Sequence, residues 1–314
     1  FSMGVTIPLV KNGEGNKSDS DNYRGITLSP VISKIFELVL MQLLQGSLYT
    51  DWLQFGFKAN SSCRHAVHVL RSTVDYYCSR GETVTLCALD ISKAFDRTNN
   101  YALLSILMKR NVPKNIIGVL LHWLTTCSIC VKWKNALSSF VPLLAGVRQG
   151  GILSPIMFSI YMDALIVRLR STGFGCNIAG LFVGCLLYVD DIMLLSHSIT
   201  AMHRMLVICQ EFALEFDLKF NTKKCVVIRI GDRWKVQCAP LLLCDMPLLH
   251  VDVCKYLGVH IIAGKKFSCS LDEMRHKFYR MFNCIYARFS TASSELVTVH
   301  LMRSYCLPIL LYCS

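Results

Sequence analysis

The sequence predicts an α+β fold built on a split βαβ, or ferredoxin-like, sheet. Short apolar runs, typical of buried strands, occur at residues 83–90, 181–187 and 192–195. Apolar residues recur at helical spacing over residues 155–170 and 202–216. Placed along the chain, these segments read strand, helix, strand, strand, helix. That order is the order of a split βαβ unit.

The segment before this unit favours one strand and two helices. Residues 5–10 form a short apolar strand candidate, and a polar loop follows at residues 12–21. Helical patterns then cover residues 30–44 and 65–78.

Further elements interrupt and follow the unit. Residues 101–126 favour helices, and residues 129–142 favour a hairpin with its turn at Trp133, Lys134 and Asn135. From Leu271 onward, apolar residues at helical spacing predict a final helix with a basic polar side.

Two adjacent carboxylates, Asp190 and Asp191, lie between the apolar runs 181–187 and 192–195. Like charges this close repel, and a buried carboxylate without a partner takes up a proton instead of staying ionised. A divalent metal ion resolves the conflict, because Mg²⁺ binds one or two carboxylates together with water and phosphate oxygens. A tight turn is the alternative interpretation, since Asp is a favoured turn residue.

A third carboxylate favours the metal site. Asp90 directly follows the apolar strand at residues 83–90. A strand-terminal Asp and a hairpin carrying Asp190 and Asp191 can meet side by side in one sheet. Together they predict a two-metal site for in-line phosphoryl transfer. Asp96, a little further on, is expected to cap or turn the segment after the strand.

Residues 146–153 contain three glycines, which let a backbone approach a ligand closely. Ser154 and Pro155 then predict a helix start, with a hydroxyl at the N-cap and proline at the first helical position. We expect a nucleic-acid contact in this loop and a helix that packs on the sheet. The alternative is an ordinary loop before a core helix.

These motifs resemble those of the reverse transcriptase domain of non-LTR (LINE-type) retrotransposons. Eight landmarks occur in the order typical of that family: residues 7–11, 22–28 with 34–37, 54–58, 89–96, 146–155, 188–191, 218–224 and 255–258. The chain departs from the family pattern at Gly25, where the family has Pro, and at residues 58–60. Neither departure touches a predicted metal ligand.

The resemblance implies a right-hand polymerase with fingers, a ferredoxin-like palm and a partial thumb. Residues 1–80 would form the fingers with part of the palm, and residues 81–262 the palm with inserted fingers segments. Residues 263–314 would be the start of a truncated thumb. Because the sequence begins at Phe1, we expect it to be a fragment of a longer protein.

The resemblance also implies an RNA-directed DNA polymerase that extends a primer 3′-hydroxyl on an RNA template. Its partners would be the RNA template, a DNA primer and deoxyribonucleoside triphosphates, and the oligomeric state is left open. Asp90, Asp190 and Asp191 would be the catalytic residues and would hold two Mg²⁺ ions, with Mn²⁺ as a substitute. Two alternatives stay open: a catalytically inactive or host-captured RNA-binding copy, and a group II intron maturase.

The remaining site residues implied by the resemblance bind the incoming nucleotide. Lys11 and Arg24 would grip its triphosphate, and Phe95 would lie under its sugar or serve only in core packing. The other expected nucleotide-binding residues are Gln149, Gly150, Gly151 and Lys223.

Composition agrees with a polyanionic partner. The chain of 314 residues has 33 Lys and Arg against 21 Asp and Glu, a net charge of +12. We interpret its 16 cysteines as reduced thiols of an intracellular protein, which would act in the nucleus. The longest apolar stretch, residues 180–195, contains Asp190 and Asp191 and is shorter than the roughly 20 residues of a membrane span, so no membrane partner is expected.

Overall fold

A five-stranded sheet occupies the centre of the protein. The computed structural model describes residues 2–11, 13, 15–289 and 294–312. The strands of the central sheet lie in the order β14-β11-β3-β10-β9. Their bounds are Leu249–His250, Val226–Ile230, Val84–Leu89, Asp191–Ser196 and Cys185–Tyr188. Strand β14 is parallel to β11, and the other neighbours are antiparallel.

The topology of this sheet is ferredoxin-like. Along the chain the elements run β3, α6 (Ser154–Ser171), β9, β10, α7 (Ile199–Glu215) and β11. In space the four strands lie in the order β11-β3-β10-β9. This combination is the split βαβ arrangement, so the fold class predicted from the strand and helix patterns is confirmed. Strand β11, which follows α7 and completes the unit, was not among the strands predicted from the sequence.

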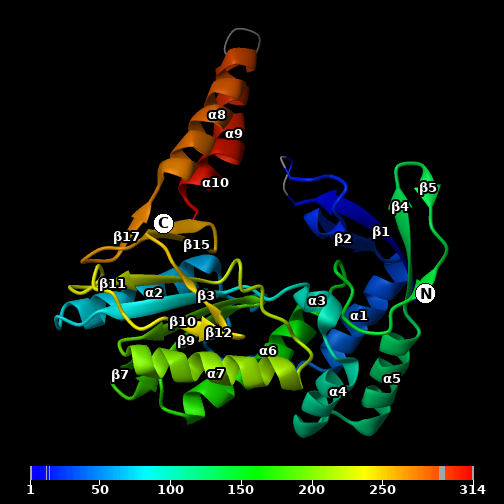
Figure 1. Cartoon of the computed structure of the whole chain (residues 1–314). Helices are drawn as coiled ribbons and strands as arrows, with labels where there is room; N and C mark the ends of the chain where they lie inside the picture. The colour runs from blue at the N-terminus through cyan, green and yellow to red at the C-terminus, as the bar shows by residue number, and fades with distance from the viewer. Residues whose placement is uncertain (1, 12, 14, 290–293, 313–314) are drawn as a thin grey trace.

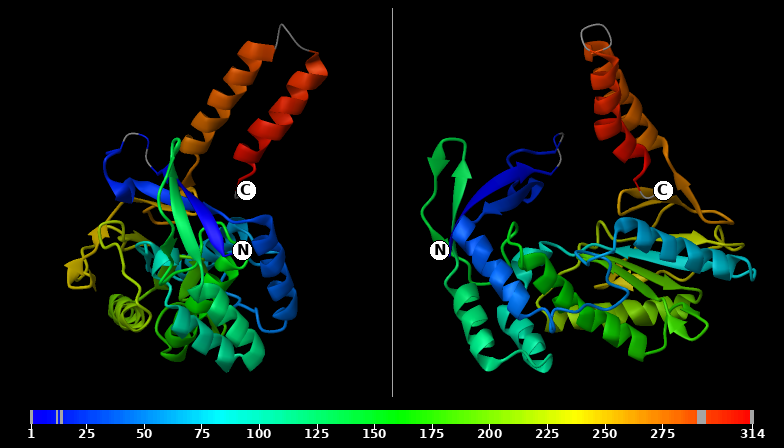
Figure 2. Two further views of the ribbon diagram at one scale, coloured as in Figure 1. Left: turned by 90° about the vertical axis from the view of Figure 1, so that its right-hand side faces the viewer. Right: turned by 180° about the vertical axis from the view of Figure 1, so that it is seen from behind.

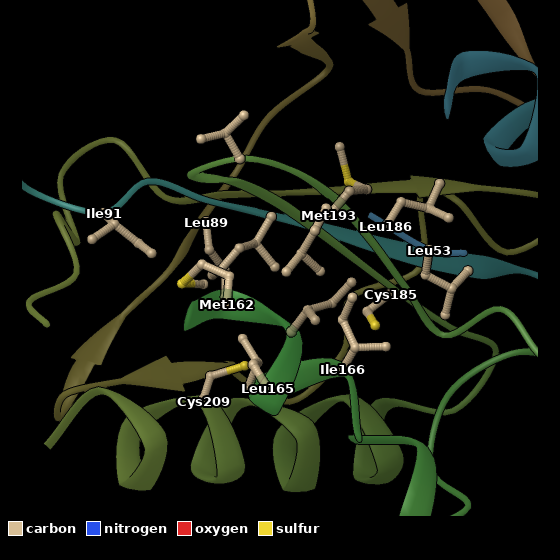
Figure 3. Packing of buried hydrophobic residues seen from close by; sticks show 14 of the residues in the cluster. Leu53, Leu89, Ile91, Met162, Leu165, Ile166, Cys185, Leu186, Met193 and Cys209 are labelled. Atoms are coloured by element: carbon tan, nitrogen blue, oxygen red, sulfur yellow. The ribbon is translucent and has the colours of Figure 1, made fainter. Parts of the chain in front are cut away.

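Helices cover both faces of the sheet. In Figure 1, α6 and α7 lie below the sheet and α2 (Cys63–Cys78) lies above it. The view from behind in Figure 2 shows the same layers. Figure 3 shows the core between the strands and the lower helices, where apolar side chains meet: Leu89, Met162, Leu165, Ile166, Cys185 and Cys209. Leu186 and Met193 are paired on neighbouring strands and are buried on the other face of the sheet. Burying these side chains supplies the main stabilisation of the sheet.

The apolar run at residues 181–187 does not form one strand, as the sequence pattern suggests. Its first residues form β8 (Leu181–Phe182), which pairs with β7 (Asn177–Ile178) in a separate hairpin. Strand β9 begins only at Cys185. The backbone N–H of Val183 bonds instead to the carbonyl of Cys176, at 2.9 Å, which ends the first hairpin before β9 starts.

The start of α6 also differs from the expectation. Ser154 is not the N-cap; Leu153 is, and the Ser154 hydroxyl makes no hydrogen bond within the described residues. Oε2 of Glu37 instead accepts hydrogen bonds from the backbone N–H groups of Ile152, at 2.5 Å, and Leu153, at 3.0 Å. A carboxylate is favourable there because it faces the positive end of the helix dipole.

A second sheet stands beside the central one. Its strands lie in the order β2-β1-β4-β5, with β6 paired to β4. Their bounds are Tyr23–Leu28, Met3–Val10, Ser128–Trp133, Ala136–Leu137 and Val141–Pro142. Strand β4 is parallel to β1, so two distant segments form one unit. The hairpin expected at residues 129–142 is confirmed, because Trp133 pairs with Ala136 around Lys134 and Asn135. Strand β2 has no counterpart in the sequence predictions.

Helices support this second sheet and connect it to the first. Figure 1 shows α1 (Val31–Leu43), α4 (Asn100–Lys109) and α5 (Lys114–Thr125) below its strands. The short α3 (Ala94–Arg97) follows β3, and one turn of 3₁₀ helix at Ser20–Asn22 precedes β2.

The C-terminal part forms small strands and a helical arm. Strands β15 (Val253–Tyr256), β16 (Val259–Ile262) and β17 (Ser268–Ser270) form an antiparallel sheet, and β12 (Leu242–Leu243) pairs with β13 (Met246–Pro247). Helix α8 (Asp272–Phe289) runs beside α9 (Glu295–Leu301), a π-helical turn (Met302–Cys306) and α10 (Leu307–Leu310). Figures 1 and 2 show these helices rising away from the central sheet.

The cysteines follow the expectation of reduced thiols within the described residues, where all of them are free. None of the helices described is long and apolar enough to cross a bilayer.

Candidate active site

The β9–β10 hairpin presents Asp190 and Asp191 at one end of the central sheet. Tyr188 pairs with Asp191, which leaves Val189 and Asp190 as a two-residue loop. Val189 has φ of +61°, a left-handed conformation that is costly for a β-branched residue. Asp190 is half-buried, and Asp191 is exposed to solvent at the start of β10.

Strand β3 brings Asp90 to the same end. Leu89 pairs with Ile192 of β10, so Asp90 emerges beside Asp191. The backbone N–H of Asp90 bonds to Sγ of Cys225 at 3.3 Å, and its carbonyl accepts from the N–H of Asn221 at 2.8 Å. The segment before β11 therefore fixes the backbone at Asp90.

Burial and the neighbouring carboxylates shift the pKa values of Asp190 and Asp191. Although the Asp191 side chain reaches solvent, the protein packed around its carboxylate, together with the neighbouring Asp190 and Asp90, raises the pKa of Asp191 to about 6. Burial, together with Asp90, also raises the pKa of Asp190. Arg24 partly offsets both shifts, so its guanidinium acts on this acidic group from the second sheet.

The carboxylates form part of the lining of an open cavity of about 950 Å³ between the two sheets. Most of the residues predicted to form the site line it: Lys11, Arg24, Asp90, Phe95, Gln149, Gly150, Asp190 and Asp191. A smaller hollow of about 350 Å³ near Asn99 and Asp217 contains none of the three carboxylates.

Lysines give the cavity a cationic lining next to its acidic floor. Nζ of Lys11 donates to the carbonyl of Asp21 at 2.9 Å. Lys93 forms an ion pair with the Asp21 carboxylate at 2.7 Å, and Nζ of Lys224 lies 3.9 Å from Oδ2 of Asp90. The sequence patterns do not single out Lys93, although its place three residues after Asp90 was a usable signal.

Phe95 lies both in the cavity lining and against the core. Its half-buried ring lines the cavity and stacks on Phe158 of α6, with ring centroids 5.0 Å apart. The core contact with Phe158 therefore fixes the ring at the cavity wall.

The glycine-rich loop lies close against β2 and α3. Nε2 of Gln149 donates to Oδ1 of Asp96 at 3.0 Å, and the carbonyl of Gln149 accepts from the N–H of Thr27 at 2.7 Å. Gly150 has φ of +120°, and a side chain there would lie 2.4 Å from the Thr27 carbonyl oxygen. The position accepts only glycine without rearrangement. Asp96 thus holds Gln149 as well as lying in α3.

Gly151 and Lys223 do not line the cavity. A side chain at Gly151 would meet Ser154 and Glu37, so this glycine serves the close packing at the start of α6. Lys223 is exposed outside the cavity, whereas the adjacent Lys224 lines it.

Divalent metal ions fit the residues present. Among the described residues, no three acidic, His or Cys side chains already stand close enough to enclose one ion. The donor set nevertheless suits Mg²⁺, which binds carboxylate oxygens, keeps several waters and is completed by phosphate oxygens of a substrate. The pKa values of Asp190 and Asp191 are raised by burial and by the neighbouring carboxylates, and a bound cation would offset both effects.

Comparison with protein families decides the identity. Residues 12–261 match the family described as "Reverse transcriptase (RNA-dependent DNA polymerase)". The chain belongs to the reverse transcriptase family. Its relatives among curated proteins are polymerases of non-LTR retrotransposons, so it is a LINE-type reverse transcriptase domain, as the resemblance implies.

Two relatives from Drosophila melanogaster illustrate the similarity of this reverse transcriptase domain. The Pol polyprotein of the type-2 retrotransposable element R2DM is 24% identical over 80% of the chain, which spans 24% of that relative. The RNA-directed DNA polymerase of the mobile element jockey is 26% identical over 87% of the chain, which spans 30% of it. The chain thus covers about a quarter to a third of these relatives.

Solved telomerase structures share the fold. Apo telomerase from Candida tropicalis aligns with a TM-score of 0.61 at 14% identity, covering 99% of the chain and 57% of the telomerase. Telomerase from Candida albicans, solved with a fragment of telomeric RNA, aligns with a TM-score of 0.53 at 12% identity and covers 99% of the chain and 56% of the telomerase. The reverse transcriptase domain therefore has the right-hand polymerase fold that was expected, with the ferredoxin-like sheet as its palm.

Proposed function

We propose that the domain extends the 3′-hydroxyl of a DNA primer on an RNA template by two-metal phosphoryl transfer. One observation carries the proposal: the central sheet brings Asp90, Asp190 and Asp191 together at the acidic floor of a cavity with a partly cationic lining. A polymerase needs this combination, because metal ions must be held where a polyphosphate also binds.

The three carboxylates would hold the metal ions, Mg²⁺ or Mn²⁺. When bound, the ions would lower the pKa of the primer hydroxyl and neutralise the pyrophosphate that leaves. The protein itself would hold the three carboxylates in position. Backbone bonds from Asn221 and to Cys225 fix Asp90, and the β9–β10 hairpin fixes the other two.

The incoming nucleotide would lie between the carboxylates and the second sheet. Lys11, Arg24 and Lys93 line the side of the cavity formed by the second sheet and the loop after β3, where a triphosphate would find cations. Phe95 would lie under the sugar. Gln149 and Gly150 would line the nascent base pair, because both residues line the cavity. Gly151 and Lys223 would act only indirectly.

The fingers, palm and thumb of the polymerase would correspond to successive parts of the chain. Residues 1–80 would supply the fingers and part of the palm, and residues 81–262 the palm with inserted fingers strands such as β4, which pairs with β1. Residues 263–314 would begin the thumb and grip the template–primer duplex with the exposed cations of α8, Arg275, Arg280 and Arg288.

The test is primer extension by the purified domain. A DNA primer annealed to an RNA template is incubated with the four deoxyribonucleoside triphosphates and Mg²⁺. We expect extension that stops when the metal is chelated and resumes when Mg²⁺ is restored. Absence of extension over a range of Mg²⁺ and Mn²⁺ concentrations, by a protein shown to be folded, would contradict the proposal.

A further inference from the structure

A segment outside the β9–β10 hairpin runs along its outer edge. The N–H of Leu187 donates to the carbonyl of Leu53, and the N–H of Phe55 donates to the carbonyl of Leu187, both at 2.9 Å. Gln54, between them, forms a parallel bridge with Leu187 and has no exposed surface. The segment therefore pairs with β9 immediately before the loop that carries Asp190.

The side chain of Gln54 reaches that loop. Its Oε1 accepts hydrogen bonds from the backbone N–H of Val189 at 2.9 Å and from that of Gly56 at 3.0 Å. Two N–H donors on one atom settle the orientation of the amide, because a flipped amide would bring its NH₂ group against both of them. Nε2 of Gln54 makes no hydrogen bond in the described part of the chain, so the acceptor is the atom used.

The loop that Gln54 holds is strained. Val189 is 4% exposed and has φ of +61°. A β-branched residue in this conformation persists only where the surroundings enforce it. The surroundings here are tight, because a side chain at Gly56 would lie 2.4 Å from Cγ2 of Val189 and 2.8 Å from its backbone N. Gln54 and Gly56 therefore both contact Val189: Gln54 accepts its N–H, and Gly56 has no side chain that would collide with it.

We propose that Gln54 is a positioning residue for the acidic site. By binding the N–H of Val189, it keeps the two-residue loop in the conformation that sets Asp190 and Asp191 beside Asp90. Gln54 does not line the cavity and would touch neither metal nor substrate. The effect of Gln54 on activity rests on the proposed polymerase function, whereas its effect on the conformation of the loop does not.

Replacing Gln54 with Met tests this role. Met has a similar length and keeps the apolar part of the side chain, but it has no strong acceptor for the two N–H groups. A matched control is Tyr77→Phe. The Tyr77 hydroxyl also bonds a backbone N–H and a carbonyl, both of Asn177 at 2.8 Å, and Tyr77 is 6% exposed. It lies outside the cavity.

Two measurements separate positioning from general stability. Amide hydrogen exchange, followed by mass spectrometry on peptides covering residues 186–192, reports on the loop without any activity. Steady-state primer extension gives kcat, KM for the nucleotide, and the affinity for template–primer. In Gln54→Met we expect faster exchange in this peptide and a kcat reduced about 10- to 100-fold, the range found when groups that orient metal ligands are removed. Template–primer affinity should be unchanged, and Tyr77→Phe should change neither exchange nor kcat.

Gly56→Ala gives a second route to the same loop. The added methyl group should displace Val189, while the side chain of Gln54 is unchanged. We expect the same faster amide exchange in residues 186–192 and the same reduction of kcat. If Gln54→Met does not fold, Gly56→Ala is the variant that tests the effect of the loop on activity. Unchanged exchange in the 186–192 peptide, or a kcat that falls no further in Gln54→Met than in Tyr77→Phe, would overturn the proposal. If the wild-type domain extends no primer, the proposed function fails, and the exchange comparison alone decides whether Gln54 holds the loop.

Discussion

Glu37 accepts a hydrogen bond from the backbone N–H of Leu153 at 3.0 Å, although the two residues are 116 positions apart in the chain. The same carboxylate lies 3.9 Å from the guanidinium of Arg148, and both side chains are almost fully buried. Arg148 also donates to the hydroxyl of Ser33 at 3.2 Å. This buried pair joins α1 to the glycine-rich loop, so the wall of the cavity is fixed from inside the protein.

Removing this carboxylate should destabilise the protein strongly. Glu37→Ala leaves Arg148 charged, buried and unpaired, and uncaps α6, which should cost about 3–5 kcal/mol of unfolding free energy. Urea denaturation measures it. The control is Glu215→Ala, which breaks the exposed Arg168–Glu215 pair (2.6 Å) and should cost about 1 kcal/mol or less. Equal losses in both variants would contradict the buried clamp.

Asp163 should make stability depend on pH. It accepts hydrogen bonds from Arg110 at 3.1 Å and from the backbone of Asp51 at 3.0 Å, yet burial raises its pKa from 3.8 to about 6. The folded state therefore holds a proton that the unfolded state releases between these values. The stabilisation from this proton is complete below about pH 4 and is lost as pH rises through about 6.

Asp163→Asn removes this dependence. Subtracting the unfolding free energy of the variant from that of the wild type should give a difference that falls by about 3 kcal/mol between pH 4 and pH 7, since one pKa unit is about 1.4 kcal/mol. Asp75→Asn, at an exposed ion pair with Arg71, should show no such slope. A flat difference for Asp163→Asn would refute the raised pKa.

Phe95 should exclude ribonucleotides. If its ring lies beneath the incoming sugar, a 2′-hydroxyl has no room, and Phe95→Val opens that space. Use of deoxyribonucleotides should fall modestly, while ribonucleotide incorporation relative to it should rise by orders of magnitude. Parallel extension assays with the two nucleotide sets measure the ratio. The control is Phe212→Leu, in the buried face of α7, which should leave the ratio of ribonucleotide to deoxyribonucleotide incorporation unchanged. An unchanged ratio in Phe95→Val would mean that Phe95 only packs against Phe158.

The parts of the fold and site that could be predicted from the sequence are those that depend on patterns within a short stretch of the chain. A short apolar strand ending on Asp90, and a hairpin with Asp190 and Asp191 at its tip, are visible within a few residues. The split βαβ order follows from the same local patterns.

Contacts between distant segments could not be predicted in this way. Glu37, rather than Ser154, caps α6 because the fold places α1 beside the loop, and no local pattern shows that. Strand β2 exists through its pairing with β1, and the run at residues 181–187 divides because β7 takes its first residues. The role of Gln54 depends on its position beside β9, which no spacing in the sequence reveals.

Asp190→Asn tests the acidic site. The substitution keeps the size of the side chain and removes one charge from the group that would hold the metal ions. On the proposed function, template affinity would depend on basic surface elsewhere and should be retained. Relief of repulsion with Asp191 means that the thermal midpoint should not fall. Asp232→Asn, an exposed carboxylate outside the cavity, is the control and should extend normally.

The most direct measurement is primer extension on an RNA template by wild-type and Asp190→Asn protein, with template–primer affinity measured on the same preparations. The account predicts a loss of extension rate of about a thousandfold or more, on the scale of removing a preorganised electrostatic group, with affinity unchanged. Substantial extension by Asp190→Asn would contradict the assignment of the acidic site.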